Sequence, residues 1–378
     1  MRVALVCSWL NQYGGAERVL EVLHDMYPQA PIYTSVYEPR ALPDFYRQWD
    51  IRPSFMQRLP LVKRKHQLFL GLFPLAFESF DLSEYDLVIS NSSAFAHGVL
   101  TREGTAHVCY CLTPARFLWN YHAYVQREKV GSLARLILPF PLHYLRTWDA
   151  AAASRVDSFV AISHAVQARI RKFYRRDSTI IYPPVNINDY QPADEVGDYY
   201  LIVSRLIPYK RIDLAVEAFN QLGLPLKIVG DGRDRAALQA MARSNVEFLG
   251  RRSDAEVRQL YARCRAFVLP GEEDFGLTPL EAQASGRPVI AYGAGGALDT
   301  VVEGETGAFF CQQTPESLAE AVASFDALAC DPHRIREHAA KFDVAVFRQQ
   351  LGELVEREYS SRYGGRMARG LMRVVAVK

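Results

Sequence analysis

The chain has 378 residues, a length typical of about two domains. Hydrophobic residues make up 49% of it and charged residues 23%, the values of an ordinary globular protein. The net charge of +2 is unevenly distributed: residues 1–176 carry 21 Lys and Arg against 14 Asp and Glu, and the remainder carries 23 against 28. This modest basic bias, without a recognised nucleic-acid-binding module, argues against a nucleic-acid partner.

The sequence also argues against a membrane-spanning or secreted chain. No apolar run reaches the ~18–20 residues that a membrane-spanning helix needs. The longest candidates, residues 68–77 and 133–145, are short and interrupted by proline. The N-terminal segment lacks the cleavage pattern of a signal peptide, and the six cysteines form no CxxC pair. Because Cys109 and Cys111 fit one face of a buried strand, we expect core thiols in a reduced, cytoplasmic protein.

Strands and helices alternate along the N-terminal half. Residues 2–7 form an apolar strand-like run, and residues 11–27 continue through a glycine turn into an amphipathic helix. Further apolar runs, separated in several places by helical patterns, lie at 32–37, 86–92, 106–111 and 158–163. Such alternation is typical of a parallel sheet covered by helices.

Residues 52–66, RPSFMQRLPLVKRKH, concentrate the positive charge and lead directly into the apolar QLFLGLFPLAF. Two interpretations are open. The segment is a solvated basic loop beside a core helix, or it is a patch that rests on an anionic membrane surface. In the second case each basic residue contributes about 1 kcal/mol. That interpretation predicts peripheral attachment to the inner face of the cytoplasmic membrane through this N-domain patch.

A stretch rich in Pro, Asn and Asp, residues 180–198, is the predicted linker. Beyond it, strands are expected at 199–206, 226–232, 246–250, 266–270, 288–293 and 307–310, and helices at 211–222, 235–244, 254–264 and 278–286. The residues after Asp343 form a helical pattern, and the basic end, 362–378, is expected to be disordered or membrane-facing.

The alternation therefore predicts an α/β protein made of two doubly wound parallel-sheet domains. Their expected bounds are 1–182 and 183–345, and the two domains are expected to face each other across a cleft. Residues 346–378 are expected to form a C-terminal helix that packs back on the N-terminal domain, followed by a basic tail.

The stretch GEEDFGLTPLEAQASG places Glu273 and Glu281 eight residues apart, on either side of a glycine turn. Thr278 fits a helix N-cap, followed by proline at the first helical position, so that Glu281 would complete a capping box. The same turn would direct backbone N–H groups into a cleft, where Gly276 permits a close approach. Acidic groups beside an anion site fit a ligand with both phosphates and hydroxyls, such as a nucleotide sugar. Both interpretations of Glu281 stand.

Two cations follow the strand-like run YYLIVS, residues 199–204. Arg205 and Lys210 lie in SRLIPYKRID, six residues after the linker and just past the end of the strand. Two cations near one pair of phosphates neutralise the charge that builds on a leaving diphosphate. The alternative is that these side chains only solvate the end of the strand.

These motifs resemble the retaining glycosyltransferases of the GT-B fold, specifically family 4, over nearly the whole chain and most strongly from Tyr199 to Phe310. SRLIPYKRID is similar to the first donor motif of the family, and residues 273–281 are similar to its E-x7-E element. YKRIDLAVEAFN and EDFGLTPLEAQASGRPVIAYGAGGALDTV look most like bacterial mannosyltransferases that use GDP-mannose in polysaccharide assembly. The resemblance implies two facing Rossmann-like domains with a cleft between them.

The resemblance also implies which residues bind the donor and which act in catalysis. The implied donor-binding residues are Gly14, Gly15, Arg205, Lys210, Gly230, Asp231, Glu273, Phe275, Gly276, Leu277 and Glu281. The implied catalytic residues are Arg205, Lys210 and Glu273. The two cations would hold the donor diphosphate, Glu273 would bond the transferred sugar, and Glu281 would accept from the ribose hydroxyls.

The glycines and backbone groups of this set have implied places as well. Gly14 and Gly15, in YGGAER, would lie near the diphosphate, and the GDG turn at 230–232 would lie near the nucleotide base. The backbone N–H groups of residues 275–277 would reach sugar hydroxyls and phosphate.

The segment YCLTPARFLWNY resembles the N-domain motif of the family, with one departure. Many relatives carry a histidine where this chain has Leu112, and that histidine is assigned to the transferred sugar or the acceptor. His122 and His97 are the candidates to replace it, although a lone histidine is more often structural. Arg116 is the candidate for binding an acceptor phosphate.

The sequence shows no metal or dinucleotide motif. No Asp-x-Asp motif lies at a suitable strand end, and the His and Cys residues lack ligand spacing. GAGG, at 293–296, lacks the GxGxxG spacing of a dinucleotide loop. The resemblance implies transfer without metal or cofactor, in which Arg205 and Lys210 replace a divalent cation and the leaving diphosphate helps deprotonate the acceptor hydroxyl.

The expected reaction moves a hexose, mannose from GDP-mannose, to a lipid-linked oligosaccharide or polysaccharide with retention at the anomeric carbon. Lipopolysaccharide and exopolysaccharide assembly are the expected settings. Three alternatives stay open: a UDP-sugar donor; a different GT-B enzyme, such as a phosphorylase or a sugar-nucleotide epimerase; and a scaffold of envelope polysaccharide assembly with a degenerate site. Leu112 is the one feature that supports the scaffold.

Overall fold

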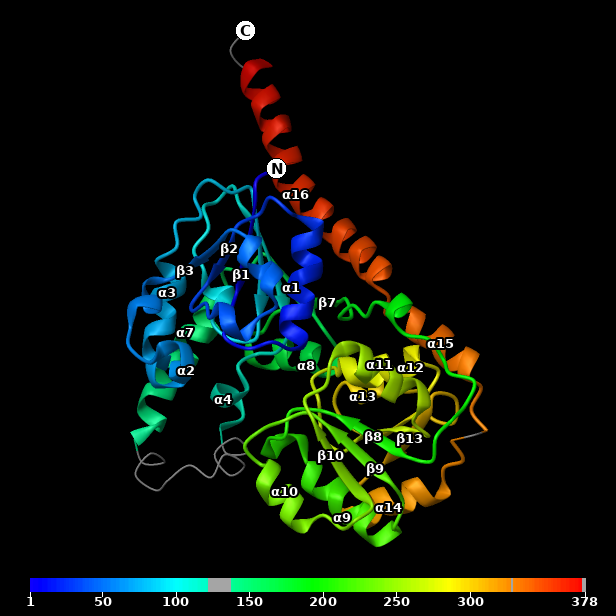
Figure 1. The fold of residues 1–378 in the computed structure, drawn as a ribbon. Coiled ribbons are helices and arrows are strands. Elements are labelled where there is room, and N and C mark those ends of the chain that lie inside the picture. The colour runs from blue at the N-terminus through cyan, green and yellow to red at the C-terminus, as the bar shows by residue number, and fades with distance from the viewer. Residues whose placement is uncertain (122–136, 328, 376–378) are drawn as a thin grey trace. The chain divides into compact units, whose positions relative to one another are not determined.

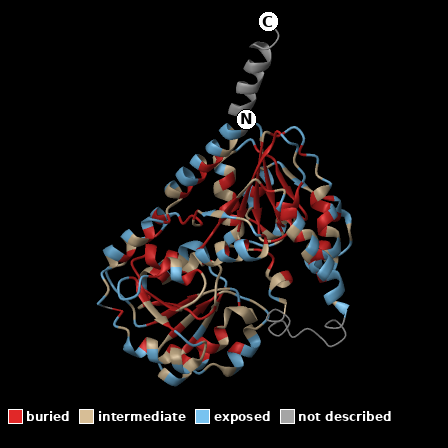
Figure 2. Ribbon diagram, turned by 180° about the vertical axis from the view of Figure 1, so that it is seen from behind, coloured by how far each residue is buried: buried red, intermediate tan, exposed pale blue. Residues whose placement is uncertain are grey.

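A computed structural model describes residues 1–121, 137–327 and 329–375, with side chains as far as residue 361 (Figure 1). The chain divides into two units, each with a parallel sheet of its own. The N-terminal unit comprises Met1–Tyr182 and Phe347–Lys378, and the C-terminal unit comprises Pro183–Val346. Most strands of both units are buried, except β3, β7 and much of β10, and the helices expose their outer faces (Figure 2).

Within the described residues, the N-terminal unit has a seven-stranded parallel sheet in the order β3-β2-β1-β4-β5-β6-β7. Its strands are β1 (Val3–Cys7), β2 (Ile32–Thr34), β3 (Ile51–Pro53), β4 (Leu87–Ser92), β5 (Ala106–Cys111), β6 (Ser158–Ala161) and β7 (Ser178–Ile180). The strand order reverses between β1 and β4. The loops that follow these two strands therefore flank the switch point, where sheets of this kind bind ligands.

The α-helices of this unit are α1 (Gly15–Met26), α2 (Val62–Lys65), α3 (Phe73–Glu78), α4 (Arg116–Trp119), α7 (Pro139–Ala153) and α8 (His164–Phe173), joined by α16 (Val344–Val375) from Phe347 on. Its 3-10 helices are η1 (Pro39–Ala41), η2 (Asp44–Gln48), η3 (Phe55–Arg58), η4 (His66–Leu72) and η5 (Ala96–Gly98). Helix α1 forms because Val19, Leu20 and Leu23 recur on one face and are buried, as an amphipathic pattern predicts.

The C-terminal unit has a six-stranded parallel sheet in the order β10-β9-β8-β11-β12-β13. Its strands are β8 (Tyr200–Val203), β9 (Leu226–Val229), β10 (Val246–Gly250), β11 (Phe267–Leu269), β12 (Val289–Tyr292) and β13 (Gly307–Phe310). The order reverses between β8 and β11, so the loops that carry SRLIPYKRID and GEEDFG begin at neighbouring strands on the two sides of the switch point.

The helices of the C-terminal unit are α9 (Ile212–Leu222), α10 (Arg235–Met241), α11 (Asp254–Arg263), α12 (Leu277–Ala284), α13 (Ala297–Thr300), α14 (Pro315–Ser324) and α15 (Pro332–Ala340), with the 3-10 helices η6 (Ile187–Asp189) and η7 (Pro208–Lys210). Helix α9 shows why these elements form where they do. Its apolar face is buried, and it ends at Gly223, whose φ of 69° is the left-handed conformation that glycine adopts without strain.

Two strands and the linker differ from the sequence predictions. The strands β3 and β7 were not predicted, because each has three residues and lacks the longer apolar run that indicates a buried strand. The predicted linker is instead a packed part of the C-terminal unit from Pro183 on. The Val185 N–H donates to Phe342 O at 2.9 Å, and Arg336 donates to Ile187 O at 3.1 Å. Its Pro and Asn residues therefore mark irregular but ordered backbone.

Two further predictions concern thiols and the C-terminus. Cys109 and Cys111 are buried on β5, as predicted. Helix α16 continues to Val375. Among the described residues, no helix is long and apolar enough to cross a membrane.

The return of α16 to the N-terminal unit depends on a small apolar contact. Phe347 is 2% exposed, and its ring meets the Tyr110 ring with centroids 5.5 Å apart. We predict that Phe347→Ala lowers the free energy of unfolding of this unit by about 3–5 kcal/mol, the usual cost of an aromatic cavity. Arg348→Ala is the control. It removes only an exposed ion pair to Asp25, which contributes about 0–1 kcal/mol. Urea unfolding measures both variants, and equal losses would show that the ring is not a core contact.

Candidate functional site

The loops after β8, β9 and β11 pack backbone against backbone in the C-terminal unit. Gly230, which follows β9, has a φ of 125°, and a Cβ at this position would lie 1.9 Å from the carbonyl oxygen of Ser204. A Cβ on Gly271, which follows β11, would lie 2.8 Å from the carbonyl oxygen of Lys210. Only glycine permits such approaches. The structure thus brings together the predicted Arg205–Lys210 and Glu273–Glu281 segments.

The GAGG run after β12 holds the loop that carries Glu273. The Gly296 N–H donates to Glu273 O at 2.9 Å, and a Cβ on Gly296 would lie 2.2 Å from the Cα of Phe275. Gly295 has a φ of 64°, and a Cβ on it would lie 2.2 Å from Glu273 O. On the other side, the buried Phe275 ring packs against Phe342. The GAGG run is visible in the sequence, but its spacing alone does not indicate a contact with the loop of Glu273.

Lys210 and Glu273 form an ion pair at the centre of these loops. The side chains are 17% and 14% exposed, and Lys210 Nζ donates to Glu273 Oε1. Lys210 also lies over the Tyr209 ring, 5.2 Å from its centroid, and the Tyr209 hydroxyl accepts from Arg205 Nη2 at 3.2 Å. The structure therefore gathers all three predicted catalytic residues in one loop cluster, with Tyr209 as a link that the sequence analysis did not include.

The pKa of Lys210 is raised above its usual value. Burial of the ammonium acts to lower this pKa, but the neighbouring Glu273 carboxylate and then Tyr209 favour the charged form more strongly. Arg205 opposes them as a like charge. Lys210 is therefore a permanent cation at any physiological pH, which suits it to binding a phosphate rather than to proton transfer.

Helix α12 begins earlier than predicted. Its N-cap is Gly276, with a φ of 91°, and no side chain caps it. Thr278 is thus inside the first turn, and the predicted capping box between Thr278 and Glu281 is wrong. The positive φ of the glycine turns the chain sharply and lets the helix start at Leu277. Pro279 is tolerated in the first turn because an N–H there would have no intrahelical partner.

Glu281 instead has a tertiary partner. Its side chain is buried, and Oε2 accepts a 2.8 Å hydrogen bond from the Tyr261 hydroxyl on α11. Tyr261 is 20 residues away in sequence and itself fully buried, so no local pattern could have indicated it. A carboxylate offers about four lone-pair positions, so this bond leaves capacity for a ligand hydroxyl.

The GDG turn after β9 is fixed mainly through its backbone. The Leu206 N–H donates to Asp231 O at 3.0 Å, and a Cβ on Gly232 would lie 2.2 Å from Leu206 O. The exposed Asp231 carboxylate accepts from the Gly232 N–H at 2.8 Å and lies 3.8 Å from Arg235. Gly230 and Asp231 therefore belong to the same loop cluster as Arg205.

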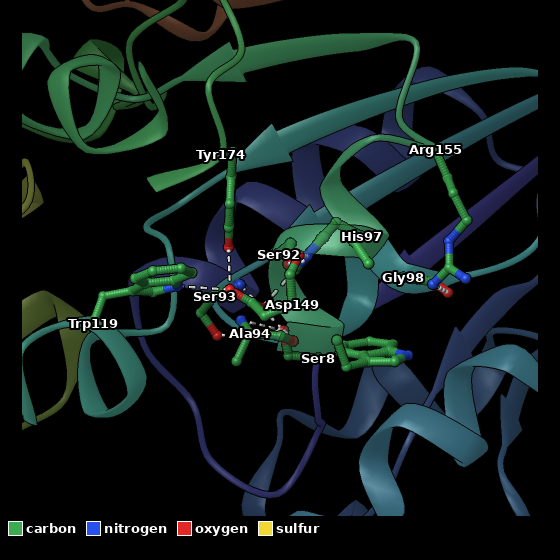
Figure 3. A network of polar contacts seen from close by, with 12 residues as sticks. Ser8, Ser92, Ser93, Ala94, His97, Gly98, Trp119, Asp149, Arg155 and Tyr174 are labelled. Carbon is green, nitrogen blue, oxygen red and sulfur yellow. Dashed lines mark hydrogen bonds and ion pairs between the residues drawn. The ribbon is translucent and has the colours of Figure 1, made fainter. Parts of the chain in front are cut away.

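In the N-terminal unit, Ser8 joins the loops at the switch point between β1 and β4. Its hydroxyl donates to Ala94 O at 2.8 Å and accepts from the Ser93 N–H at 3.1 Å (Figure 3). The predicted Gly14 and Gly15 lie on the β1 side of this point, at the N-cap and first residue of α1. The two glycines thus follow one of the two strands that flank the switch point, where sheets of this topology commonly bind ligands.

His97 lies in a buried polar network rather than on a surface (Figure 3). It is 2% exposed, and its Nε2 is 3.5 Å from Oδ1 of the fully buried Asp149. Asp149 Oδ2 accepts from Trp119 Nε1 at 2.7 Å and from the Tyr174 hydroxyl at 2.9 Å. Burial lowers the pKa of His97 and raises the pKa of Asp149. The network ties η5, α4, α7 and α8 together, which is a structural role for His97.

The structure also places Arg116 and Leu112 of the N-domain motif. Arg116 is the first residue of α4 and half-buried, and Leu112 follows β5, where its N–H donates to Ser92 O at 2.8 Å. His122 lies outside the described residues. Within the part of the chain that the structure describes, no three His, Cys, Asp or Glu side chains gather as a metal site.

Two family profiles match the chain. Residues 13–189 match Glycosyltransferase Family 4, and residues 187–342 match Glycosyl transferases group 1. The boundary between the matches falls close to the boundary between the two structural units. Together the matches support a family 4 glycosyltransferase, and the SRLIPYKRID and GEEDFG stretches lie in the second matched region.

Curated relatives are similar over parts of the chain. The O-antigen chain mannosyltransferase RfbU of Salmonella typhimurium is 29% identical over 230 residues, 55% of this chain and 62% of the relative. A GDP-mannose-dependent alpha-mannosyltransferase of Mycolicibacterium smegmatis is 47% identical over 107 residues, 28% of each chain. The alpha-1,3/1,6-mannosyltransferase ALG2 of Dictyostelium discoideum is 23% identical over 60% of this chain and 66% of its own length. The chain thus spans less than two thirds of the length of these relatives.

Solved structures share the fold. HepE from Anabaena, crystallised with UDP, has a TM-score of 0.71 at 20% identity, over 94% of this chain and all of HepE. Sucrose-phosphate synthase from Thermosynechococcus elongatus has a TM-score of 0.72 at 19% identity, over 96% of this chain and all of that chain. With the two parallel sheets, these similarities establish the predicted GT-B fold class of two Rossmann-like domains.

The close packing at Gly230 can be tested by substitution. Gly230→Ala places a methyl group on the Ser204 carbonyl, so the loops after β8 and β9 have to separate. Gly223→Ala is the control, because Gly223 also has a positive φ, 69° against 125° for Gly230, and nothing lies within 4 Å of a Cβ there. The control should cost about 1–2 kcal/mol of unfolding free energy, as for any non-glycine residue in this conformation. We predict a clearly larger loss for Gly230→Ala in urea unfolding; similar losses would show that the loops do not depend on the glycine.

Proposed function

We propose that the protein transfers mannose from GDP-mannose to a lipid-linked oligosaccharide or polysaccharide, with retention of anomeric configuration. The observation that carries this proposal is the Lys210–Glu273 ion pair at the switch point of the C-terminal sheet. It places a cation for a diphosphate and a carboxylate for a sugar side by side, next to the N-terminus of α12.

The ion pair suggests how the donor would be bound. A diphosphate that approaches Lys210 competes with Glu273 for the ammonium, and Arg205 supplies a second cation from the exposed side of Tyr209. Release from Lys210 frees the Glu273 carboxylate to accept from a sugar hydroxyl. The N–H groups at the start of α12 add positive potential, because no side chain caps that helix. Charge that develops on the leaving diphosphate is then stabilised by groups already in place.

The remaining donor contacts follow from the same loops. Glu281 would accept from ribose hydroxyls with the lone pairs that the Tyr261 hydroxyl leaves available. The turn at Gly230 and Asp231 would lie against the base, and Gly14 and Gly15 are also proposed to bind the donor. Donor binding would need neither metal nor cofactor, since Arg205 and Lys210 carry the charge that a divalent cation would supply.

The donor base and sugar are proposed from the relatives. Three of the relatives described above are named as mannosyltransferases, and one of these is named as GDP-mannose-dependent. A UDP-sugar donor is the second candidate, favoured by the UDP and UDP-glucose in the HepE crystals. The two donors differ at the base, which the loops at Gly230–Gly232 would contact, so they can be separated by binding alone.

The proposed setting is the cytoplasm, at the inner face of the membrane. All six cysteines are free thiols, which suits a reducing compartment. The proposed lipid-linked acceptor would be presented at a membrane surface. The half-buried Arg116 of α4 is proposed to contact a phosphate of that acceptor.

Calorimetric titration tests the donor site. We predict that the wild-type protein, in EDTA, binds GDP-mannose and GDP more tightly than UDP-glucose and UDP. Lys210→Ala should weaken GDP binding about 10- to 100-fold, the worth of one charge-assisted contact. Arg334→Ala is the matched control, since it removes a cation that is 82% exposed on α15 and should leave affinity unchanged. Tight metal-free binding with that contrast supports the proposal.

Other outcomes of the titration would change the proposed function. Selective binding of UDP-glucose would keep the transferase and replace the donor. Binding only with added divalent metal would overturn the proposed role of Arg205 and Lys210. No binding of any nucleotide would favour a scaffold protein with a degenerate site, the alternative that Leu112 raises. Once transfer to an acceptor is observed, the one-bond C1–H1 coupling constant of the transferred mannose, measured by NMR, reports retention or inversion.

A further inference from the structure

Large apolar side chains are exposed in two segments of the N-terminal unit. Among the described residues, Phe140 is 78% exposed, Leu68 72% and Leu61 65%, the highest exposures of large hydrophobic side chains. In the first segment the exposed apolar side chains are Leu61 just before α2, Leu68 in η4 and Leu75 in α3; in the second they are Ile137 just before α7, and Phe140 and Tyr144 in its first turns. Grouped apolar exposure of this kind marks an interaction surface, unlike single exposed residues.

These side chains project from well-packed elements. Val62, Phe73 and Phe77, from the first segment, are fully buried in the core of the unit, as is Leu145 of α7. The exposure of Leu61 and Leu68 therefore does not reflect a loose segment. Each helix presents one face to the core and leaves its apolar outer face without a partner in the described structure.

The two segments lie side by side. Trp148 of α7 donates to the Glu78 carboxylate of α3 at 2.8 Å, and Arg155 forms an ion pair with the same carboxylate at 2.8 Å. Figure 1 shows α2, α3 and α7 grouped on one side of the N-terminal unit. The exposed leucines and the Phe140 face thus belong to one surface, which we call the α2–α7 face and define by residues 58–75 and 137–144.

The charge on this face is of one sign. Residues 51–77 contain no Asp or Glu, and neither do residues 137–148. Arg58, Arg64 and Lys65 are exposed on the first segment. The basic patch contains fewer available cations than the sequence predicted. Arg52, on β3, has its guanidinium 2.7 Å from the Asp50 carboxylate, and the His66 side chain is buried. Lys63 also points elsewhere, with its ammonium 4.0 Å from Glu38.

We infer that the α2–α7 face binds an anionic lipid bilayer, with the exposed apolar side chains entering the interface and Arg58, Arg64 and Lys65 meeting lipid phosphates. Apolar side chains beside unopposed cations match the two properties of such a surface, a hydrocarbon layer under a negative plane. A second copy of the chain fits less well, because two basic faces repel each other. The inference deepens the proposed function, on which its biological meaning rests, by naming the surface that brings the enzyme to a lipid-linked acceptor.

Vesicle co-sedimentation tests the inference with the full chain. The wild-type protein is expected to bind vesicles of phosphatidylglycerol and phosphatidylcholine at 0.1 M salt, and to bind pure phosphatidylcholine at least 10-fold more weakly. The double variant Leu68→Ser with Phe140→Ser should reduce binding at least 10-fold at both 0.1 M and 0.5 M salt. Arg64→Gln with Lys65→Gln should have a similar effect at 0.1 M salt and less at 0.5 M, where the charges are screened.

The matched control lies in the C-terminal unit. Leu298→Ser with Arg334→Gln removes one exposed leucine and one exposed cation there, and should leave vesicle binding unchanged. Donor titration on every variant separates this inference from the proposed function, because the α2–α7 face and the Lys210 loops belong to different units. A protein that binds donor but ignores anionic vesicles would overturn the inference alone. So would light scattering that shows a dimer lost in Leu68→Ser with Phe140→Ser, which would assign the face to self-association.

Discussion

The close approach of backbone to backbone at the carboxyl edge of the C-terminal sheet determines the candidate site. Gly230, Gly271 and Gly296 allow loops from four strands to touch without intervening side chains. The topology brings these loops to one place, because the strand order reverses between β8 and β11. Because the loops are so close, the ammonium of Lys210 and the carboxylate of Glu273 are in contact. The glycines therefore set the geometry, and the charged residues supply the chemistry.

The Lys210–Glu273 pair explains why a strongly charged site is compatible with a stable fold. A half-buried ammonium without a partner would be costly, and the Glu273 carboxylate offsets that cost. In the proposed donor site, this pair would make ligand binding an exchange of partners rather than a simple addition of contacts. On this view, the affinity for a diphosphate reflects the difference between phosphate and carboxylate as partners of Lys210. The Tyr209 ring also supports the cation, with its centroid 5.2 Å from Lys210 Nζ.

Local patterns in the sequence predicted much of the fold and the donor motifs, and tertiary contacts account for the rest. Apolar runs such as 106–111 indicated strands that the structure contains, whereas the three-residue β3 and β7 gave no such signal. The predicted start of α12 was wrong, because the positive φ of Gly276 lets the helix begin before the capping sequence at Thr278. Tyr261 could not be predicted at all, since only folding brings it to Glu281. The roles of the site residues remain predictions.

A crystal structure of the protein with GDP bound would test the central claim most directly. The account predicts that the β-phosphate lies within hydrogen-bond distance of Lys210 Nζ and Arg205, that the ribose hydroxyls reach Glu281, and that Glu273 no longer bonds Lys210. A nucleotide bound away from the loops after β8 and β11, or bound there with the Lys210–Glu273 pair intact, would contradict the exchange of partners on which the proposed mechanism depends.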